Sequence, residues 1–537
     1  MPRPGSAGRR WHHDWRIDAI PETSSKHVAR SMNPFPQFPA VGRTGAFAAV
    51  SLFFLLPLVG QISTPGIVPA ELDGRWVGQV QHDRDTAFIG FEFQRQPDGR
   101  VLARAWLPNV NAYGSPVGWV TVADGRLLVR ESNIPLTLVN GVLTGSFYLP
   151  DLTFTVRPTI EALPAEPEPP SVDPGPAPVW SFQAGAPLWA GPVVAGRIAY
   201  LGDAGGRFHA VDVGNGRELW SFDAGAPLFG PAAVSGDAVY FAADNGQLYK
   251  LSRKTGARLW RTAIGGAGIR SLPALGAPEW DYLTAAPVVA DGTVYLGSAS
   301  GVFRALAAGT GATRWSFTTG GKIRAAARVA GDRVFVGSMD HFVYALDRRT
   351  GARLWRFDTG SPVTTTPVPA GERLVIGTRD QALLYALNAA DGKKLWTVYY
   401  WLSWVESTPA LVDGLLYIGA SDSRRVRVIE PDTGHVRWTV QVWGWTWGTP
   451  LVVGDTVYYG TAGAPQYFIT QKASLGALDR QTGALKWRKA IPAPDKGYVF
   501  GIAGSLAYAD GKILAANLDG TLSAYEVPQP ATVSVPP

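Results

Sequence analysis

The chain has 537 residues, a formal net charge of +6 and no cysteine. Residues 1–43 carry seven Lys and Arg against three Asp and Glu, and subtracting these from totals of 49 and 43 leaves 42 basic and 40 acidic residues further on. This balance excludes the basic footprint of a nucleic-acid-binding protein. The lack of cysteine excludes a disulfide framework, a thiolate metal site and a cysteine-linked lipid anchor.

The first 70 residues are predicted to be a leader that lies outside the fold. Residues 45–60, GAFAAVSLFFLLPLVG, are apolar and uncharged and follow Arg43, which is typical of the hydrophobic region of a secretory signal. Met32 offers a second start, and Val68-Pro69-Ala70 offers a cleavage site. We therefore expect export to the periplasm or the cell exterior. The alternative is an uncleaved anchor at 45–60, which would be the protein's one contact with a membrane.

Residues 71–160 do not repeat and are predicted to form a small antiparallel β-domain. Stretches with alternating apolar residues are joined by Asp-Gly or Asn-Gly turns, a pattern that indicates successive hairpins. A sandwich and a partly closed barrel are both compatible with it. Gly74, Trp76 and Gly78 loosely resemble the opening of lipocalin-like barrels. Residues 161–178 are rich in proline, which predicts an extended linker.

Residues 179–529 are predicted to form an eight-bladed β-propeller, followed by a tail at 530–537. Short strands repeat with a period near 40 residues, which is typical of propeller blades. Tryptophans mark the repeat: Trp180, Trp220, Trp260, Trp315, Trp355, Trp396, Trp438 and Trp487. The last unit, 503–527, has no such Trp, whereas VWSFQ at 179–183 precedes the first unit. We expect this early segment to supply the outer strand of the last blade and so leave no open edge.

The same turn precedes the fourth strand of most predicted blades, as in DRRTGARLW at 347–355. Asp347 can accept hydrogen bonds from the backbone N–H groups ahead of it, and Gly351 can take the positive φ that closes the hairpin. Trp355 is expected to pack where one blade meets the next. We interpret these residues as structural.

These units resemble the pyrroloquinoline-quinone (PQQ)-like β-propeller repeat, which carries the pattern Ala-x-Asp-x-x-Thr-Gly-x-x-x-Trp. ALDRRTGARLW (345–355) and ALDRQTGALKW (477–487) match throughout, and AVDVGNGRELW (210–220) departs only at Asn215. The resemblance implies the propeller fold but not one chemistry. It leaves two branches, namely non-enzymatic scaffolds of the BamB type and quinoprotein dehydrogenases that act on an alcohol or a sugar.

The enzyme branch implies PQQ, a Ca²⁺ ion with carboxylate and amide ligands, an Asp base and, typically, two adjacent cysteines. This chain has no cysteine, and its predicted inner strands show no Glu/Asn/Asp set for the cation. We therefore predict no catalytic residues, no metal site and no cofactor, and we favour a scaffold with a protein or peptide partner. PQQ and Ca²⁺ belong to the alternative. BamB-type scaffolds of bacteria are usually lipoproteins, and without cysteine this chain departs from them.

The predicted binding face is the one where the second-to-third and fourth-to-first connections of the blades emerge. The long departures from the repeat, 262–284 and 461–476, fall in such connections, as do YYWLSW (399–404) and VWGWTW (442–447). Because Trp is enriched at binding hot spots, we expect the face to display Trp401, Trp404, Trp445 and Trp447 to a partner. The alternative is that the aromatic residues of these runs, such as Tyr399 and Trp443, pack between blades.

A central funnel is predicted where the inner strands begin. Comparable offsets place six residues around it: Trp189, Phe229, Tyr282, Arg324, Glu406 and Phe500. Such a funnel would be partly aromatic, would carry one cation and one anion, and would suit a peptide or a planar ligand. An ion pair between Arg324 and Glu406 and separate solvated side chains are equally compatible with the sequence.

Overall fold

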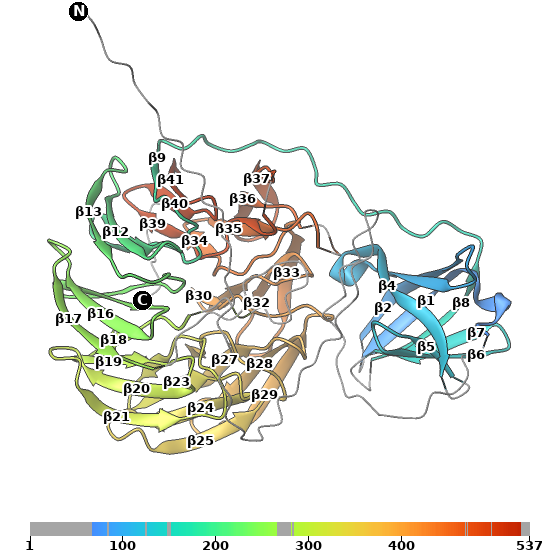
Figure 1. Cartoon of the computed structure of the whole chain (residues 1–537), viewed down its shortest axis with the longest axis horizontal. Helices are drawn as coiled ribbons and strands as arrows, with labels where there is room; N and C mark the ends of the chain where they lie inside the picture. The colour runs from blue at the N-terminus through green and yellow to red at the C-terminus, as the bar shows by residue number, and fades with distance from the viewer. Residues whose placement is uncertain are drawn as a thin grey trace, which may run out of the picture.

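A computed structural model of the chain describes residues 67–527, apart from 83–84, 124–125, 148–151, 266–280, 282–283, 468, 470 and 496. The described residues form two β-domains joined by a long extended connection (Figure 1). Their only helices are two short 3-10 turns, η1 (Ala70–Leu72) and η2 (Pro108–Val110), and neither could span a bilayer. The predicted signal segment at 45–60 and the predicted tail lie outside the described residues.

The N-terminal domain is an antiparallel barrel in which each strand pairs with the next and the last strand pairs with the first. The small antiparallel domain expected from the sequence is therefore present, and its sheet closes fully. The eight strands are β1 (Gly74–His82), β2 (Asp85–Arg95), β3 (Val101–Leu107), β4 (Ala112–Ala123), β5 (Arg126–Val129), β6 (Ile134–Val139), β7 (Val142–Ser146) and β8 (Thr153–Thr159).

The inward-facing side chains of these strands fill the barrel. Phe91 and Phe93 on β2 alternate with more exposed neighbours, and Phe154 on β8 packs against Phe91 with ring centroids 5.1 Å apart. Trp76 is buried on β1, and its indole N–H donates to the carbonyl of Leu72 at 2.9 Å, which ties η1 to the barrel. Burying each such side chain contributes about 1.5–3 kcal/mol to folding.

The C-terminal domain is a propeller of eight antiparallel sheets, which confirms the predicted fold. The inner strands are β10 (Val193–Ala195), β14 (Ala233–Ser235), β18 (Val288–Ala290), β22 (Arg328–Ala330), β26 (Val368–Ala370), β30 (Ala410–Val412), β34 (Leu451–Val453) and β39 (Ala507–Ala509). The second strands are β11 (Ile198–Gly202), β15 (Ala238–Ala243), β19 (Thr293–Leu296), β23 (Arg333–Gly337), β27 (Arg373–Gly377), β31 (Leu415–Ile418), β35 (Thr456–Gly463) and β40 (Lys512–Ala516).

The two outer positions of each blade are equally regular. The third strands are β12 (Arg207–Asp212), β16 (Gln247–Ser252), β20 (Val302–Ala307), β24 (Phe342–Asp347), β28 (Leu383–Asn388), β32 (Arg425–Ile429), β36 (Ser474–Asp479) and β41 (Thr521–Glu526). The outermost strands are β13 (Glu218–Asp223), β17 (Arg258–Ala263), β21 (Thr313–Thr318), β25 (Arg353–Asp358), β29 (Lys394–Tyr399), β33 (Val436–Gln441), β37 (Leu485–Ala490) and β9 (Trp180–Gln183). Blade 7 gains a fifth strand, β38 (Phe500–Gly501), which pairs with β35.

The ring closes through strands from opposite ends of the propeller sequence. Strand β9 pairs with β41, with Trp180 opposite Ala524 and Gln183 opposite Thr521. This is the closure predicted from the Trp strand without its own blade. The connection from β8 crosses back over the propeller to reach β9 (Figure 1).

A repeated contact joins neighbouring blades. At the junction of blades 3 and 4, Trp315 donates its indole N–H to the carbonyl of Arg348 at 3.1 Å. Its ring also packs on Gly351, where an added Cβ would lie 2.5 Å from Cε3 of Trp315. The same indole bond, at 2.9–3.2 Å, occurs for Trp180, Trp220, Trp260, Trp355, Trp396 and Trp438.

The Asp-x-x-Thr-Gly turn has the geometry expected from the sequence. Oδ1 of Asp347 accepts hydrogen bonds from the N–H of Arg349 at 3.1 Å and from the N–H and hydroxyl of Thr350, both at 2.7 Å. The bonds from Thr350 lower the pKa of Asp347 below its usual value. Gly351 has a φ of +76°, which side chains with a Cβ rarely adopt.

The last junction takes its glycine from the linker. Blade 8 has no Asp-x-x-Thr-Gly turn before β9, and Gly175 takes the position that the turn glycine has at the other junctions. An added Cβ at Gly175 would lie 2.4 Å from Cε3 of Trp487. Gly175 has a φ of +70°, and its N–H donates to Oδ1 of Asp173 at 2.7 Å. The carbonyl of Asp173 accepts from the N–H of Arg488 at 2.9 Å. The end of the linker therefore completes the ring of Trp–Gly contacts.

Candidate functional site

The inner strands of all eight blades converge on one central pocket with a cavity volume of ≈ 150 Å³. Its lining repeats at two fixed offsets. Four residues before each inner strand stand Trp189, Phe229, Thr284, Arg324, Thr364, Glu406, Trp447 and Ala503, which we call the first ring. Two residues before each inner strand stand Gly191, Pro231, Ala286, Ala326, Thr366, Thr408, Thr449 and Ser505, which we call the second ring.

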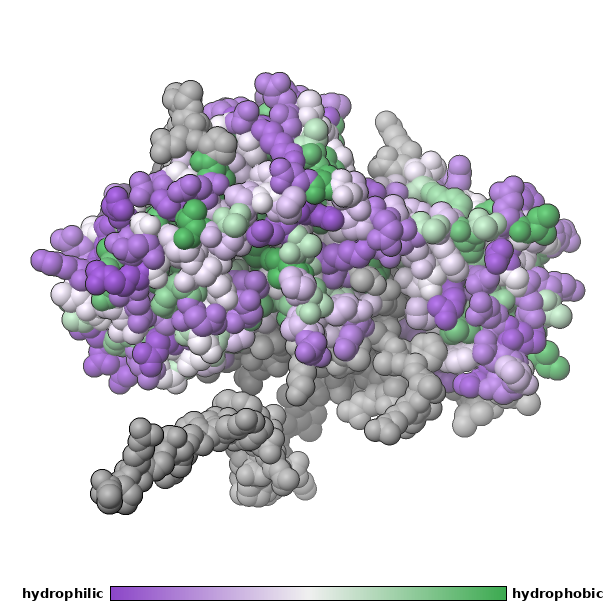
Figure 2. All heavy atoms as spheres, turned by 90° about the horizontal axis from the view of Figure 1, so that it is seen from above, coloured by the Kyte–Doolittle hydropathy of each residue, from purple (hydrophilic) through white to green (hydrophobic). Residues whose placement is uncertain are grey.

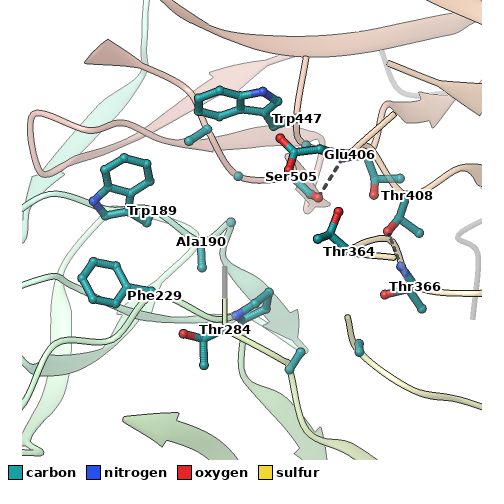
Figure 3. Close-up of a pocket in the computed structure, with 18 of the residues that line it drawn as sticks. Trp189, Ala190, Phe229, Thr284, Thr364, Thr366, Glu406, Thr408, Trp447 and Ser505 are labelled. Atoms are coloured by element: carbon teal, nitrogen blue, oxygen red, sulfur yellow. Dashed lines mark hydrogen bonds between the residues drawn. The ribbon is translucent and has the colours of Figure 1, made fainter. Parts of the chain in front are cut away.

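Aromatic side chains occupy one side of the first ring. Trp189 and Phe229 meet edge to face, with ring centroids 6.4 Å apart and planes at 70°. Trp447 approaches from blade 7, across Ala503 of blade 8. We call Trp447, Trp189 and Phe229 the aromatic arc, and Figure 3 shows them facing a group of threonines across the pocket.

Hydroxyl groups of the second ring line the pocket from blade 5 to blade 8, opposite Trp189 and Phe229 at blades 5 and 6 and beside Trp447 at blades 7 and 8. Thr366, Thr408, Thr449 and Ser505 come from four consecutive blades, and we call them the hydroxyl arc. Two of them are fixed by their neighbours, because Thr408 Oγ1 accepts from the N–H of Thr366 at 3.1 Å and Ser505 Oγ accepts from the N–H of Thr449 at 3.0 Å. The pocket wall therefore combines aromatic rings with hydroxyl groups, and the two kinds of side chain lie side by side at blades 7 and 8.

Arg324 in the first ring forms a buried ion pair with Asp281. Nε and Nη2 of Arg324 donate to the two carboxylate oxygens at 2.7 and 2.6 Å, and Lys322 adds a contact at 2.8 Å. Burial alone would raise the pKa of Asp281, but the bonds and charges of Arg324 and Lys322 hold it below its usual value. Asp281 thus holds the guanidinium of Arg324 at the pocket wall.

Glu406 in the first ring is paired in the same way with a different arginine. Nε of Arg379 donates to Oε1 of Glu406 at 2.6 Å, and both side chains are buried. The guanidinium of Arg379 also lies 4.7 Å from the ring centroid of Trp404. The two interpretations left open for Arg324 and Glu406, a mutual pair and solvated side chains, are both wrong, because each is bonded to a neighbour inside the wall.

The structure places four of the six predicted funnel residues in the pocket wall: Trp189, Phe229, Arg324 and Glu406. Phe500 does not line the pocket; it lies on β38 opposite Gly463, and Ala503 holds the ring position of its blade. Tyr282 lies outside the described residues, and Thr284 holds the ring position there. In both blades the connection before the inner strand departs from its usual length, and the predicted residue stands two or three positions before the observed ring position. Counting back from the inner strand would have found both positions, and Thr364 and Trp447 as well.

The prediction that Trp445 and Trp447 are displayed to a partner is wrong. Trp445 is 0% exposed and stacks on Trp447 with centroids 4.7 Å apart. Its indole N–H donates to Oδ1 of Asp422 at 2.8 Å, and that of Trp447 donates to Ser421 at 3.4 Å. The second-to-third connection of blade 6 thus covers both indoles. Trp447 keeps a place in the pocket wall, whereas Trp445 supports it from behind.

Trp401 and Trp404 are partly buried rather than fully displayed. Trp401 packs on Tyr399, with centroids 5.4 Å apart, and on the core of the N-terminal barrel. Trp404 packs beside Trp445 and Trp447 under Arg379. Packing between blades, the alternative for these aromatic runs, accounts for Tyr399 and Trp443, which are both buried.

The protein's own barrel covers part of the predicted face. Leu402 and Ile469, from two of the elaborated propeller loops, belong to the barrel's hydrophobic core. His82 at the end of β1 stacks on Tyr399 with centroids 3.9 Å apart. The aromatic run 399–404 and the extended loop 461–476 therefore hold the barrel against blades 5 to 7.

Buried polar groups fix this contact. Asn111, next to η2, donates from Nδ2 to the carbonyl of Asp422 at 2.9 Å and accepts from Nε2 of Gln441 at 2.6 Å. Arg424 is 0% exposed and reaches Glu166 of the linker at 2.8 Å. Burial raises the pKa of Asp422 to about 6, although Trp445 and Tyr467 both donate to its carboxylate. These residues belong to no repeat in the sequence, so the sequence analysis did not predict this contact.

The described lining does not fit PQQ. A cavity of ≈ 150 Å³ falls short of the roughly 300–1,000 Å³ of sites that enclose a drug-sized ligand. PQQ carries three carboxylates, and Arg324, the cation in the described lining, is already bonded to Asp281. Among the described residues, no group of three or more His, Cys, Asp or Glu side chains is arranged to hold a metal ion.

Comparison with known proteins gives one family match. The family model described as outer membrane protein assembly factor BamB matches residues 171–277, 275–366 and 340–533. No curated protein matches the chain. Similar solved structures share low identity with it, so they indicate a common propeller fold and no more.

Three of these structures illustrate the range. BamB from Moraxella catarrhalis is 18% identical over 66% of this chain and 100% of its own, with a TM-score of 0.48. Quinohemoprotein alcohol dehydrogenase from Comamonas testosteroni is 16% identical over 67% of this chain and 78% of its own, with a TM-score of 0.50. Sqt1 from Saccharomyces cerevisiae is 12% identical over 66% of this chain and 100% of its own, with a TM-score of 0.51.

Proposed function

Because the chain belongs to the family of the outer membrane protein assembly factor BamB, we propose that it is an exported, non-enzymatic scaffold that binds a protein or peptide partner. The partner would bind on the face where the second-to-third and fourth-to-first connections emerge and the central pocket opens. The barrel covers the side of this face above blades 5 to 7, and the partner would use the pocket and the remaining loops.

The observation that carries this proposal is the chemistry of the pocket wall. Aromatic rings and hydroxyl groups bind neutral groups well, whereas Arg324 and Glu406 are each held in a buried ion pair. Neither charged group is placed to exchange a proton with a bound molecule. The side of the molecule in Figure 2 shows apolar side chains in small separate groups, so a broad apolar patch is not the means of recognition on that side.

Export is supported by the uncharged apolar segment at 45–60 and by the family's description as an outer-membrane assembly factor. Fractionation of cells that express the full chain, together with N-terminal sequencing of the mature protein, tests this. A mature chain that begins near residue 71 in the envelope fraction is expected. Recovery of the intact chain from the cytosol would overturn export.

Site-specific photo-crosslinking tests the binding face. A photoreactive phenylalanine at Ala204, in the second-to-third connection of blade 1, or at Ala326 in the second ring should give the same partner adduct in living cells. The same residue at Ala352, an exposed position in a third-to-fourth turn on the opposite side, is the matched control and should give none. Equal adducts from all three positions, or none from any, would contradict a specific binding face.

The alternative function is that of a PQQ-dependent quinoprotein oxidoreductase acting on an alcohol or a sugar. The fold shared with the quinohemoprotein alcohol dehydrogenase is the observation in its favour. Purified protein incubated with PQQ and Ca²⁺ tests it, with the quinone absorption band and dye reduction as readouts. A bound quinone with alcohol-dependent dye reduction would replace the scaffold proposal.

A further inference from the structure

The size of the central pocket limits what it can hold. Its volume of ≈ 150 Å³ equals that of an engineered apolar cavity that binds benzene, of about 150 Å³. A space of this size encloses about one aromatic ring, so any larger molecule would extend out of the mouth of the pocket. A ligand that fits would therefore be one side chain of a larger molecule that stays outside.

The aromatic arc favours a ring in that space. Trp189 and Phe229 already meet edge to face at 70°, and such arrangements extend favourably to a third ring. Trp447 is held in place by its stack on Trp445 and its bond to Ser421. The arc is thus ordered before a ligand arrives, so that little side-chain entropy is lost on binding.

Thr364 supplies the polar part of the site. It stands in the first ring, on the blade opposite Trp189, and is 5% exposed. Its Oγ1 has no hydrogen-bond partner in the protein. A buried hydroxyl without a partner is destabilising, and turning the Thr364 side chain about χ1 toward the pocket would let a polar group beside the bound ring bond to Oγ1, which is covered as it stands.

The ion pairs in the wall favour an uncharged ligand. A carboxylate that approached Arg324 would compete with Asp281, and an ammonium that approached Glu406 would compete with Arg379. Breaking a buried pair is strongly destabilising, because it leaves the other charge buried without a partner. Neutral groups avoid that competition, and a peptide amide is a neutral group that can both donate to and accept from a hydroxyl.

We propose that the central pocket is a socket for one uncharged aromatic side chain of the partner protein, whose adjoining peptide group hydrogen-bonds Thr364. This proposal rests on the proposed scaffold function and adds the chemistry by which the partner is recognised. The ring inserts against the aromatic arc, and the partner's backbone stays at the mouth of the pocket.

The test uses small probes and the full-length protein. N-acetyl-phenylalaninamide presents one neutral ring with a peptide group on each side, and N-acetyl-glutamic acid amide is its charged counterpart. Saturation-transfer NMR should detect the aromatic probe on the wild-type protein, and the charged probe should bind at least tenfold more weakly. PQQ is measured in parallel.

Three variants locate the binding. Ala326→Phe places a phenyl group in the second ring, where it fills the pocket, and should abolish saturation transfer to the aromatic probe. Ala352→Phe makes the same change on the opposite side and should leave transfer intact. Thr364→Val removes the hydroxyl and keeps the side chain's shape nearly constant. It should therefore weaken binding of the aromatic probe several-fold, while the melting temperature stays the same or rises. A purely structural role for Thr364 would leave the affinity for the aromatic probe unchanged, whichever way the melting temperature moves.

The outcomes separate this proposal from the scaffold function. Absence of transfer to the aromatic probe, or transfer that survives Ala326→Phe, overturns the socket while partner adducts at Ala204 would still support the scaffold. Tight binding of PQQ that Ala326→Phe abolishes would overturn both. Equal binding of the aromatic and charged probes would overturn the uncharged socket.

Discussion

The blades meet one another through a contact that recurs around the ring, whereas the barrel meets the propeller through groups that occur once. A blade junction consists of an indole on a glycine and one N–H bond to a carbonyl, as in Trp315 on Gly351. The barrel junction instead buries Asn111, Arg424 and the carboxylate of Asp422. The Trp–Gly contact itself contains no ionisable group, and the ion pair beside it, Arg348–Asp291, is partly exposed, whereas the barrel junction buries the ionisable side chains of Arg424 and Asp422.

Because of this difference, we expect the two kinds of junction to respond differently to pH and salt. A Trp–Gly contact with backbone bonds responds little to pH or salt, and it occurs at all eight blade junctions, at seven of them together with the indole N–H bond. A junction with a buried carboxylate responds to pH, because burial disfavours the charged form. We therefore expect the propeller to be the rigid part and the attachment of the barrel to be the part that conditions can alter.

Deleting residues 179–183 should have the largest effect, because it removes β9 from a blade junction and from the closing sheet at once. The edge of β41 would be exposed, and Trp180 would leave Gly216. A loss of more than about 3 kcal/mol in the free energy of unfolding is expected, with oligomers by size exclusion and light scattering. Val179→Ala trims an exposed side chain of the same segment and should melt like the parent. If the deletion mutant also melts like the parent, β9 does not close the propeller.

Valine at Gly351 and at Gly175 should cost about the same, roughly 3 kcal/mol each, since both have positive φ and both contact an indole. Thr350→Val removes two exposed hydroxyl bonds, one donated to Asp347 and one accepted from the N–H of Ala352, and should cost about 1 kcal/mol or less. Thermal melts of the three variants make the comparison. A mild effect of Gly175→Val beside a severe one of Gly351→Val would show that the linker does not complete the eighth junction.

A pH titration should distinguish the two kinds of junction. The pKa of Asp422 is raised to about 6 in the folded protein, whereas an unfolded aspartate has a pKa of about 3.9. Between these values the native state holds a proton that the unfolded state has lost. The stabilising contribution is therefore present at low pH and is lost as the pH rises to about 6, by up to roughly 3 kcal/mol.

Asp422→Asn cannot titrate and isolates this contribution. The stability difference between wild type and Asp422→Asn should change between pH 4 and 7.5, in favour of the wild type at the lower pH. The difference between wild type and Gly351→Val should not change over the same range. Equal pH dependence in both comparisons would mean that Asp422 is not the titrating group.

The propeller could be predicted from the sequence because its determinants repeat. A turn such as 347–351 appears with the same spacing in most blades, so each copy supports the interpretation of the others, and the closure follows from one Trp strand that lacks a blade. Four first-ring positions were predicted as such, namely Trp189, Phe229, Arg324 and Glu406. Thr284 and Ala503 were missed where the connection before the inner strand departs from its usual length, and Thr364 was missed although its connection has that length.

The environment of the loop tryptophans could not be predicted in this way. Trp445 is buried because Asp422, 23 residues earlier, accepts its N–H. Trp401 is partly buried because a barrel from another part of the chain packs on it. Neither Asp422 nor the barrel belongs to a repeat or motif that links it to these tryptophans. The enrichment of Trp at binding sites therefore led to the prediction that they are exposed to a partner. Long-range polar contacts of this kind carry no local signal.

Apart from the Thr350→Val comparison, the smallest effect is expected from the amide that joins the barrel to blade 6. Asn111 has a φ of +59°, so Asn111→Gly removes the side chain without backbone strain, whereas Ala would add strain. Losing its bonds to Asp422 and Gln441 should cost about 1–2 kcal/mol. Amide hydrogen exchange should become faster in 399–404 and around η2 and stay unchanged in the turn at 347–351. Gln441→Ala removes the other partner, and the two effects should be less than additive because they break a shared bond. Thr137→Ala, on an exposed position of β6, is the control within the barrel. If Asn111→Gly instead speeds exchange in the blade junctions, the barrel is part of the propeller's own framework and the two kinds of junction are not independent.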